Sequence, residues 1–353
     1  MANIIPYGFR DMRDLADTAV TEALVPRIDK AIVDTVEFHN EEMDRVMDFF
    51  VKRTTDYKVK YRTPTSARLM GLDEHGRARK IRPGAEYEIG LPIQAAGLAE
   101  GATDTTRLLE TVQDVMDITA TMTLADKNWM LDHVLAALFN ATTWTFPDDR
   151  YGDLVVQPIA NGDTVTYLKK NGAAATADHV NGQAAAIADA TNPFPGIYSR
   201  LTRPAANSGE VVSFVAENLV TSIEGLGNFI EYSDPDVRQP ANTEELIGRL
   251  PDTMPGMVLG KVDKVWVVQW DRLPDSYVLS TVTGGERPLA MREYPVAALK
   301  GFRRAGQRND YPYFETQFKR DAGFGAWNRV AADVLEIGDA SYDVPTGYES
   351  PMQ

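Results

Sequence analysis

The sequence contains no cysteine, which excludes disulfide bonds, thiolate metal sites and cysteine nucleophiles. No apolar stretch approaches the roughly 18 uninterrupted residues of a membrane-spanning helix. The first twenty residues show no basic start followed by an apolar run and a small-residue cleavage site, so we expect no signal peptide. The sequence therefore predicts a chain that is made and kept in water.

Motifs for catalysis are also scarce. The histidines are scattered, none has the H-E-x-x-H spacing of a zinc protease, and no G-x-S-x-G motif marks a hydrolase. We expect packed or solvated side chains at all four positions: His39, His75, His133 and His179.

The segment "GMVLGKV" resembles a phosphate-binding loop only superficially. Three residues separate Gly256 from Gly260 where four are needed, and Val262 stands where the magnesium-binding Ser or Thr belongs. Two carboxylate pairs, Asp148 with Asp149 and Asp234 with Asp236, lie beside prolines, as is typical of solvated turns rather than cation sites. We expect no catalytic residue, no cofactor and no metal ligand, hence no enzyme.

Charge is unevenly distributed along the chain. The net charge is -15 and the pI is near 4.8, so the chain as a whole should repel nucleic acid. Between residues 58 and 82, however, eight basic residues face only two acids, a local charge of +6 that leaves -21 on the remainder. The basic residues are Lys58, Lys60, Arg62, Arg68, Arg77, Arg79, Lys80 and Arg82. A partner of this segment is expected to be an acidic protein surface.

Periodicity predicts the elements of the first half. Residues 11–53 are expected to be helical with a break at Pro26, because apolar residues recur three or four positions apart. Residues 54–102 include an Asp-Glu-His-Gly turn between two short flanks, which predicts a hairpin. A lone hairpin is marginal in water, so this one should lie on a partner. Residues 103–141 lack Gly and Pro and predict one long helix or two nearly continuous ones.

The second half of the sequence predicts a body that mixes strands and helices. Strands are predicted in "DLVVQPI", "TVTYLKK" and twice in "KVDKVWVVQWDRLPDSYVLST", and a strand that runs into a helix in "GEVVSFVAENLVTSIEGLGNF". A small helix is predicted in "HVNGQAAAIADA" behind an Asp178 cap. The segment "YFETQFKRDAGFGAWNRVAADVLEI" predicts a β-hairpin that bends at Gly323 and Gly325.

The order of these parts is similar to that of the major capsid proteins of tailed double-stranded DNA bacteriophages. The segments "GNFIEYSDPDVR", "LPDSYVLSTVTGGERPLAMREYP" and "DAGFGAWNRVAADVLEIGDASY" look like segments that recur in one branch of these proteins. The resemblance implies an α+β fold with an N-terminal arm, an extended loop, a spine helix, a peripheral domain and an axial domain. The implied ranges are 1–56 (arm), 57–102 (extended loop), 103–141 (spine helix), 142–310 (mostly axial domain) and 311–353 (return to the peripheral domain).

By this resemblance the chain assembles as hexamers and pentamers into an icosahedral shell around DNA, which it encloses without reading its sequence. The implied location is the virion capsid, and the host cytoplasm during assembly. The implied partners are other copies of the chain, a separate scaffolding protein, a portal and decoration proteins. The eight basic residues would contact a neighbouring subunit through the extended loop, where opposite charge fixes register more than it adds affinity. A non-viral nanocompartment shell and a soluble α/β enzyme remain alternatives.

Overall fold

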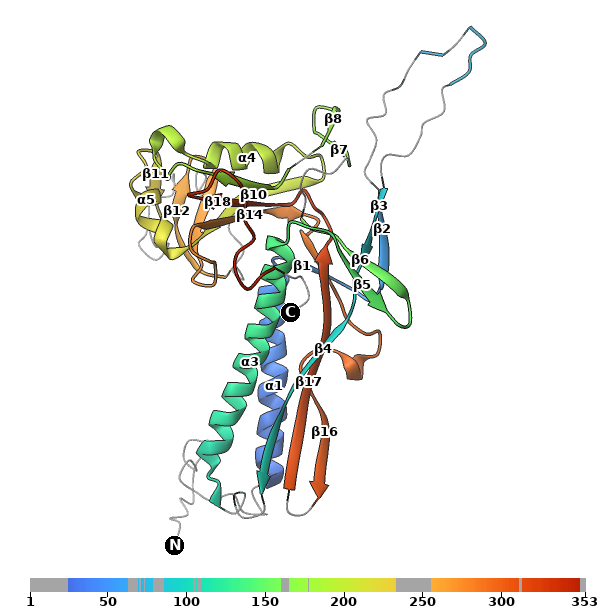
Figure 1. Ribbon diagram of the computed structural model, residues 1–353, viewed down its shortest axis with the longest axis vertical. Coiled ribbons are helices and arrows are strands. Elements are labelled where there is room, and N and C mark those ends of the chain that lie inside the picture. Colours follow the sequence, from blue (N-terminus) through green and yellow to red (C-terminus); the bar gives the residue numbers. More distant parts are fainter. Residues whose placement is uncertain are drawn as a thin grey trace, which may run out of the picture. The chain divides into compact units, whose positions relative to one another are not determined.

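The computed structural model describes residues 25–62, 69, 71–72, 74–78, 86–103, 106, 109–159, 165–176, 178–232, 255–310 and 313–349. The chain divides into two compact units, each assembled from separated segments (Figure 1). Unit 1 comprises Met1–Asp44, Gln94–Leu131 and Glu293–Ala322, and unit 2 comprises Arg45–Ile93, Asp132–Arg292 and Gly323–Gln353.

Unit 1 consists of two long helices and three antiparallel strands. The helices are α1 (Val25–Met47) and α3 (Val112–Phe139), whose last residues belong to unit 2. The strands are β4 (Gln94–Thr103), β16 (Arg303–Asp310) and β17 (Tyr313–Ala326), and β17 lies between the other two. The long register of β4 with β17, from Gln94 opposite Ala322 to Thr103 opposite Tyr313, makes this sheet narrow and elongated.

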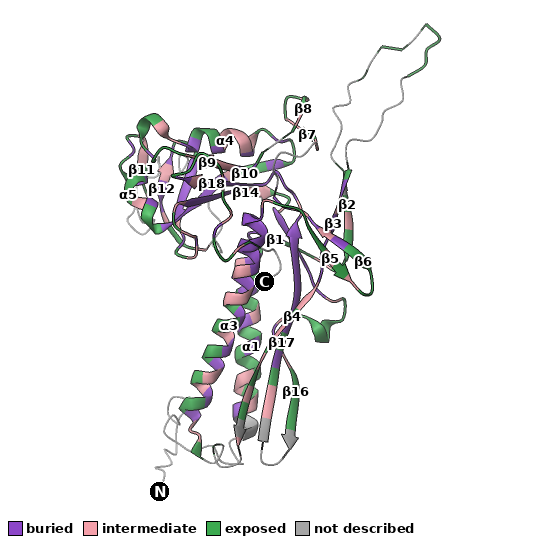
Figure 2. Cartoon of the chain, in the orientation of Figure 1, coloured by how far each residue is buried: buried purple, intermediate pink, exposed green. Residues whose placement is uncertain are grey.

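The core of unit 1 follows the apolar stripe of α1. Ile28 and Ile32 pack with the start of α3, and Val36 packs farther along, with Phe302 and Phe318 from the strand region. Burial in α1 is therefore confined to one face, as its colouring in Figure 2 shows. The helical periodicity of α1 places these residues on one side, which gives the helix a face to lay on its neighbours.

A mixed sheet of seven described strands forms the main body of unit 2. Its order is β11-β12-β13-β10-β14-β18-β9. The strands span Phe229–Glu231 (β11), Met257–Val262 (β12), Val265–Gln269 (β13), Asn207–Val215 (β10), Tyr277–Gly285 (β14), Ala332–Ile337 (β18) and Val180–Gln183 (β9). Helices α4 (Phe194–Thr202) and α5 (Val220–Glu224) contribute Ile197 and Ile223 to a core that includes Val211 and Val278. The central strands β10 and β14 are nearly continuous runs of buried residues, as expected of strands covered on both faces.

The rest of unit 2 is built from small strand pairings. β1 (Val51–Thr54) runs parallel to β15 (Leu289–Arg292), which pairs antiparallel with the last four residues of β17. Three two-stranded pairs complete it: β2 (Lys58–Arg62) with β3 (Glu86–Gly90), β5 (Trp144–Asp148) with β6 (Gly152–Val156), and β7 (Tyr167–Leu168) with β8 (Ala174–Ala175).

Several sequence predictions are confirmed. "DLVVQPI" contains β6, "TVTYLKK" contains β7, and "KVDKVWVVQWDRLPDSYVLST" contains β13 and the start of β14. "GEVVSFVAENLVTSIEGLGNF" runs from β10 into α5. The long helix is present as α3, and none of the helices in the described ranges is long and apolar enough to cross a membrane.

The helix boundaries in the first half differ from the prediction. The predicted helix of residues 11–53 ends at Met47, because residues from Val51 onward form β1 and pair with β15; residues 11–24 lie outside the described part. Likewise Thr103 ends strand β4 instead of beginning a helix. In both places a ladder to a strand about 200 residues away in sequence overrides local helical preference.

Two predictions in the second half are wrong. Residues 180–183, predicted as part of a small helix, form β9, which lies parallel to β18 at the edge of the large sheet. The predicted terminal hairpin does not exist, because β17 runs straight through Gly323 and Gly325 and β18 belongs to the large sheet. Gly323 instead allows a close approach of backbones, since a Cβ atom there would lie 2.0 Å from the Pro92 carbonyl oxygen.

Candidate subunit interface

The β2–β3 hairpin forms the two arms of the basic segment. Its register places Lys60 opposite Glu88 and Arg62 opposite Glu86. The strands alternate charged and apolar residues, and Tyr87 and Ile89 of β3 are buried in a small cluster of unit 2. The alternation therefore sets one face of the hairpin on the body and leaves the charged face to solvent.

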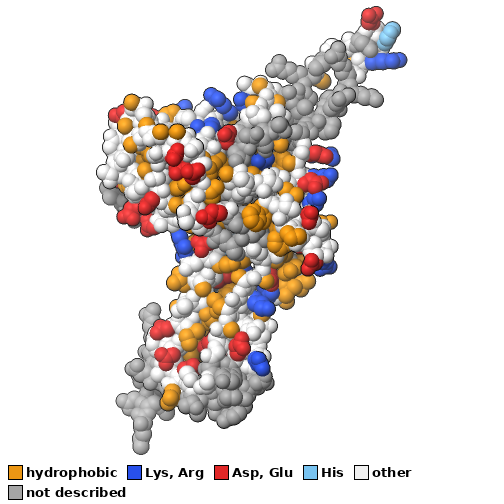
Figure 3. Space-filling view, viewed as in Figure 1, with side chains coloured by type: hydrophobic (Ala, Val, Ile, Leu, Met, Phe, Trp, Pro, Cys, Tyr) orange, Lys and Arg blue, Asp and Glu red, His pale blue; other side chains and the backbone are white. Residues whose placement is uncertain are grey.

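The basic residues of the hairpin arms pair with carboxylates of their own chain. Lys58 Nζ lies 2.5 Å and Lys60 Nζ 3.3 Å from Glu88, and Arg62 Nε donates to Glu86 over 3.0 Å. The side chains remain between 37% and 66% exposed. Figure 3 shows acidic and basic side chains next to one another in the region of the hairpin arms. Exposed ion pairs contribute little to stability, so these side chains stay available for exchange with other partners.

The two carboxylates change the charge of the whole hairpin. Lys58 and then Lys60 hydrogen-bond Glu88 and lower its pKa below the usual value. Over residues 58–90 the chain carries eight basic and four acidic residues, a net charge of +4. The hairpin is therefore basic, but less so than the +6 counted up to Arg82.

The described residues between the two arms are exposed. They are Leu69, Gly71, Leu72 and residues 74–78, which include His75 and Arg77. A Cβ atom built at Gly71 or Gly76 would meet no atom within 4 Å. Four of the predicted contact residues, Arg68, Arg79, Lys80 and Arg82, lie outside the described residues. The role of all eight at a subunit contact stays a prediction.

A buried arginine anchors the base of the hairpin. The rings of Tyr57 and Tyr151 stack with their centroids 4.1 Å apart. The Arg292 guanidinium lies 5.9 Å from the first centroid and 5.1 Å from the second, and its Nη1 donates to the Leu91 carbonyl over 2.9 Å. Arg292 is only 4% exposed. Cation–π contacts of a desolvated guanidinium reach about 2 kcal/mol, which helps to fix the direction in which the hairpin leaves the body.

Close backbone packing fixes the second arm. A Cβ atom at Gly90 would lie 2.6 Å from the Val155 nitrogen of β6, so only glycine allows this approach. Gln157 Nε2 donates to the Glu88 carbonyl over 3.0 Å. The hairpin therefore has a rigid root in unit 2 and an exposed far end.

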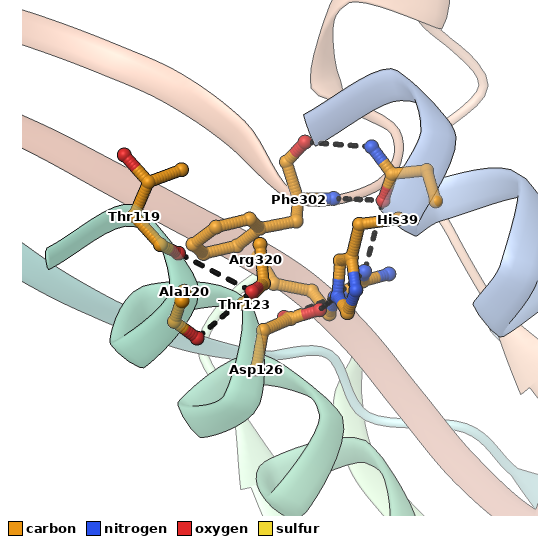
Figure 4. Close-up of polar contacts among 8 residues, drawn as sticks. His39, Thr119, Ala120, Thr123, Asp126, Phe302 and Arg320 are labelled. Atoms are coloured by element: carbon orange, nitrogen blue, oxygen red, sulfur yellow. Dashed lines mark hydrogen bonds and ion pairs between the residues drawn. The ribbon is translucent and has the colours of Figure 1, made fainter. Parts of the chain in front are cut away.

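A second polar site lies inside unit 1, where Asp126 of α3 contacts two other elements, α1 and β17 (Figure 4). Arg320 of β17 binds this carboxylate in bidentate fashion, with Nε 2.5 Å from Oδ1 and Nη2 2.6 Å from Oδ2. His39 of α1 lies 2.8 Å from Oδ2 through its Nε2. Arg320 Nη2 also donates to Asn40 Oδ1, and Asn40 holds the backbone N–H and C=O of Phe302.

The protonation of this cluster follows from its geometry. Burial raises the pKa of Asp126, but hydrogen bonds from His39 and Arg320 outweigh burial and hold the pKa below its usual value. Because an ionised carboxylate only accepts hydrogen bonds, His39 Nε2 must carry the donated proton. Asp126 and Arg320 carry opposite charges, and together with His39 they tie α1, α3 and β17 to one another.

The histidines and carboxylates considered in the sequence analysis show no catalytic arrangement among the described residues. His133 is buried beside the ring of Phe324, and His179 is buried with no hydrogen-bond partner for either ring nitrogen in the described structure. Asp148 accepts the backbone N–H groups of Arg150 and Tyr151, as a turn residue does. Asp234 and Asp236 lie outside the described residues. Among the described residues no group of three His, Asp or Glu side chains could hold a metal ion.

The segment "GMVLGKV" forms strand β12 from Met257 onward and is not a loop before a helix. It pairs with β13 over most of its length, and its glycine at position 260 packs against the Ile230 carbonyl of β11. The likeness to a phosphate-binding loop is therefore coincidental, as expected, and close strand packing accounts for the glycine at position 260.

Sequence reasoning missed the partners of both charged sites. Glu86 and Glu88 lie just beyond the stretch used for the charge count, and the hairpin register was the signal that could have found them. Asp126 and Arg320 are 194 residues apart in sequence, so no local pattern connects them.

Comparison with known proteins rests on structure. No protein-family model and no curated protein matches the sequence. A solved structure from Mycobacterium phage Patience matches 99% of this chain and 98% of its own, with a TM-score of 0.68 and 19% identity. The asymmetric unit of the mature capsid of bacteriophage PhiM1 matches 82% of this chain and 86% of its own, with a TM-score of 0.52 and 10% identity. The chain therefore has the major capsid protein fold of tailed phages.

Proposed function

We propose that this chain is the major capsid protein of a tailed double-stranded DNA phage. Copies assemble as hexamers and pentamers into an icosahedral shell that encloses the genome and forms the virion capsid. The observation that carries the proposal is the structural match over 99% of the chain to a phage protein. The role is structural, so the chain needs no catalytic residue or cofactor.

The domains of this fold are assigned on the same basis. The assignment takes 1–56 as the arm, 57–102 as the extended loop, 103–141 as the spine helix, 142–310 as mostly axial domain and 311–353 as the return to the peripheral domain. The positions of α1, the β2–β3 hairpin and α3 support the first three. Strand β4 lies within 57–102 except for its last residue, Thr103, but it pairs with β17, so we place it with the peripheral domain.

The extended loop is proposed to lie over a neighbouring subunit. A hairpin of charge +4 belongs to a chain whose remainder then carries -19, so opposite charges can meet at every contact of a shell. Such contacts steer and register subunits while each stays weak. Repeated over a closed shell they add up, because each new neighbour turns the next contact into an intramolecular one.

Charge reversal of the loop tests this role. Replacing Arg77, Arg79 and Lys80 together by Glu should leave a folded subunit that no longer forms shells. Circular dichroism checks the fold, and electron microscopy counts the particles. The matched control replaces Lys169, Lys170 and Arg203 by Glu, which changes the net charge equally at another exposed region of unit 2. Normal shells from the loop variant would contradict the electrostatic role.

Electron microscopy of the purified chain tests the function itself. The chain alone, or with a co-expressed scaffolding protein from the same genome, should form closed shells or rings of five and six subunits. A small soluble oligomer under both conditions would instead favour the alternative of a soluble α/β enzyme. A portal gene beside the coding sequence, rather than a cargo enzyme gene, separates a phage capsid from a nanocompartment shell. Scaffolding, portal and decoration proteins are the further proposed partners.

A further inference from the structure

Unit 1 has a hollow on its surface between α3 and the strands. It has a volume of about 180 Å³, and its lining is mostly apolar: Ala96, Leu98, Ala125, Trp129 and Phe302. Asp126 and Arg320 also reach it, but each satisfies the other through two hydrogen bonds. An apolar cavity of about 150 Å³ accepts a benzene molecule. The hollow is therefore large enough for one branched apolar side chain and offers no unpaired charge against it.

The exposed end of the hairpin carries apolar side chains without a described partner. Leu69 is fully exposed and Leu72 is 64% exposed, in a stretch that is otherwise rich in Gly and charged residues. A solvated loop gains nothing from two leucines three positions apart, whereas a loop that docks gains the burial of about 25 cal/mol per Å² of their surface. These leucines have the size that the hollow accepts.

Charge also favours unit 1 as the surface on which the hairpin docks. Unit 1 contains twelve Lys and Arg against twenty Asp and Glu, a net charge of -8 in 112 residues. Unit 2 without the hairpin (residues 58–90) carries -11 in 208 residues, a lower density of negative charge. On α1 the residues Asp34, Glu37, Glu41 and Glu42 are all exposed. The +4 hairpin therefore meets the denser negative charge on unit 1.

From the leucines, the hollow and this charge match, we infer that Leu72 of one subunit, with Leu69 beside it, inserts into the Ala125 hollow in unit 1 of a second copy. The contact is heterologous, since a hairpin meets a hollow, and heterologous contacts close into rings when the rotation permits. The inference rests on the proposed function and assigns the seat of the extended loop. The leucines supply burial at the centre, and the surrounding charges supply register.

The absence of native cysteine allows a direct test by disulfide cross-linking. One preparation carries Leu72→Cys, and a second, 15N-labelled, carries Ala125→Cys; Ala125 is exposed, so neither change should disturb the fold. The two are mixed, assembled and mildly oxidised, and the disulfide-linked peptides are identified by mass spectrometry. We expect a 72–125 disulfide between a labelled and an unlabelled chain. The double variant should give a ladder on a denaturing gel that ends at five or six subunits.

The matched control pairs Leu72→Cys with Gln113→Cys. Gln113 is exposed on the same helix, about 18 Å from Ala125 at a rise of about 1.5 Å per residue. We expect at least a tenfold lower yield of the mixed disulfide there. An equal yield, or a double variant whose 72–125 disulfide forms only within one chain, overturns the inference. Shells that assemble without a 72–125 link overturn the docking alone, whereas small soluble oligomers of the unmodified chain overturn the proposed function.

Discussion

Removal of the Asp126 carboxylate should destabilise unit 1 far more than an average substitution does. In Asp126→Ala, the side chain of Arg320 would remain buried, 4% exposed, without its counter-charge. His39 would lose the acceptor of its Nε2 proton as well. Breaking a buried ion pair from one side costs about 3–5 kcal/mol of unfolding free energy, because the remaining charge cannot regain its hydration.

A double-mutant cycle with Arg320→Met isolates the pair. Methionine retains much of the arginine stem and removes the charge, so the double variant buries no unpaired guanidinium. We expect the double variant to be less destabilised than the sum of the single variants, with a coupling energy near the upper end of about 0.5–3 kcal/mol. The buried, bidentate geometry is the reason for expecting the upper end.

Trp129 makes the measurement specific to unit 1, since it is the sole tryptophan of that unit's sequence. Fluorotryptophan incorporated into an assembly-deficient subunit gives one 19F resonance for each of the five tryptophans, and Trp129→Phe assigns the reporter. Urea titration of that resonance yields the unfolding free energy of unit 1. A loss below about 1 kcal/mol in Asp126→Ala, or strictly additive single variants, would refute the view of Asp126 as the tie between α1, α3 and β17.

Two further predictions concern unit 2. Burial, with Arg200 and Arg329 nearby, lowers the pKa of His179 to about 3 from 6.5. The unfolded chain therefore binds one more proton than the folded chain between these values, and stability should fall by roughly 1.4 kcal/mol per pH unit as the pH drops from 6.5 toward 3. His179→Phe should remove that slope in urea titrations at several pH values; an unchanged slope assigns it to other groups. Gly323→Ala would place a Cβ 2.0 Å from the Pro92 carbonyl oxygen, so we expect a loss of about 1–3 kcal/mol in thermal or urea unfolding. Gly306→Ala, with no atom within 4 Å of its Cβ, is the control and should stay within about 0.5 kcal/mol; equal losses would contradict the packing argument.

The hairpin shows how a charge count depends on its limits. Up to Arg82 the segment carries +6, but the return strand brings Glu86 and Glu88 opposite its basic residues and reduces the charge to +4. The arms are therefore largely neutralised within the chain. Electrostatic contact with a neighbouring subunit would therefore depend mainly on basic residues between the arms. Among these, Arg77 is described and exposed. The charge-reversal experiment accordingly alters tip residues and not the arms.

Local patterns in the sequence determined much of the secondary structure. The apolar stripe of α1, the breaker-free run of α3 and the hydrophobic runs of β10, β13 and β14 each form the element that their periodicity predicts. These elements depend on residues within one or two turns or strands, which a single sequence displays. The order of the elements also determined the resemblance to phage capsid proteins.

Only the tertiary structure decided where strands pair and where charges are buried. β1, β4 and β9 pair with β15, β17 and β18, whose sequences are about 150 to 240 residues away, so no local signal announces them. Gly323 does not form a turn but permits a close approach to Pro92. The neighbouring backbone requires glycine at this position, and the local sequence does not reveal that neighbour. The Asp126–Arg320 pair and the apolar hollow beside it arise in the same way, from side chains that folding brings together.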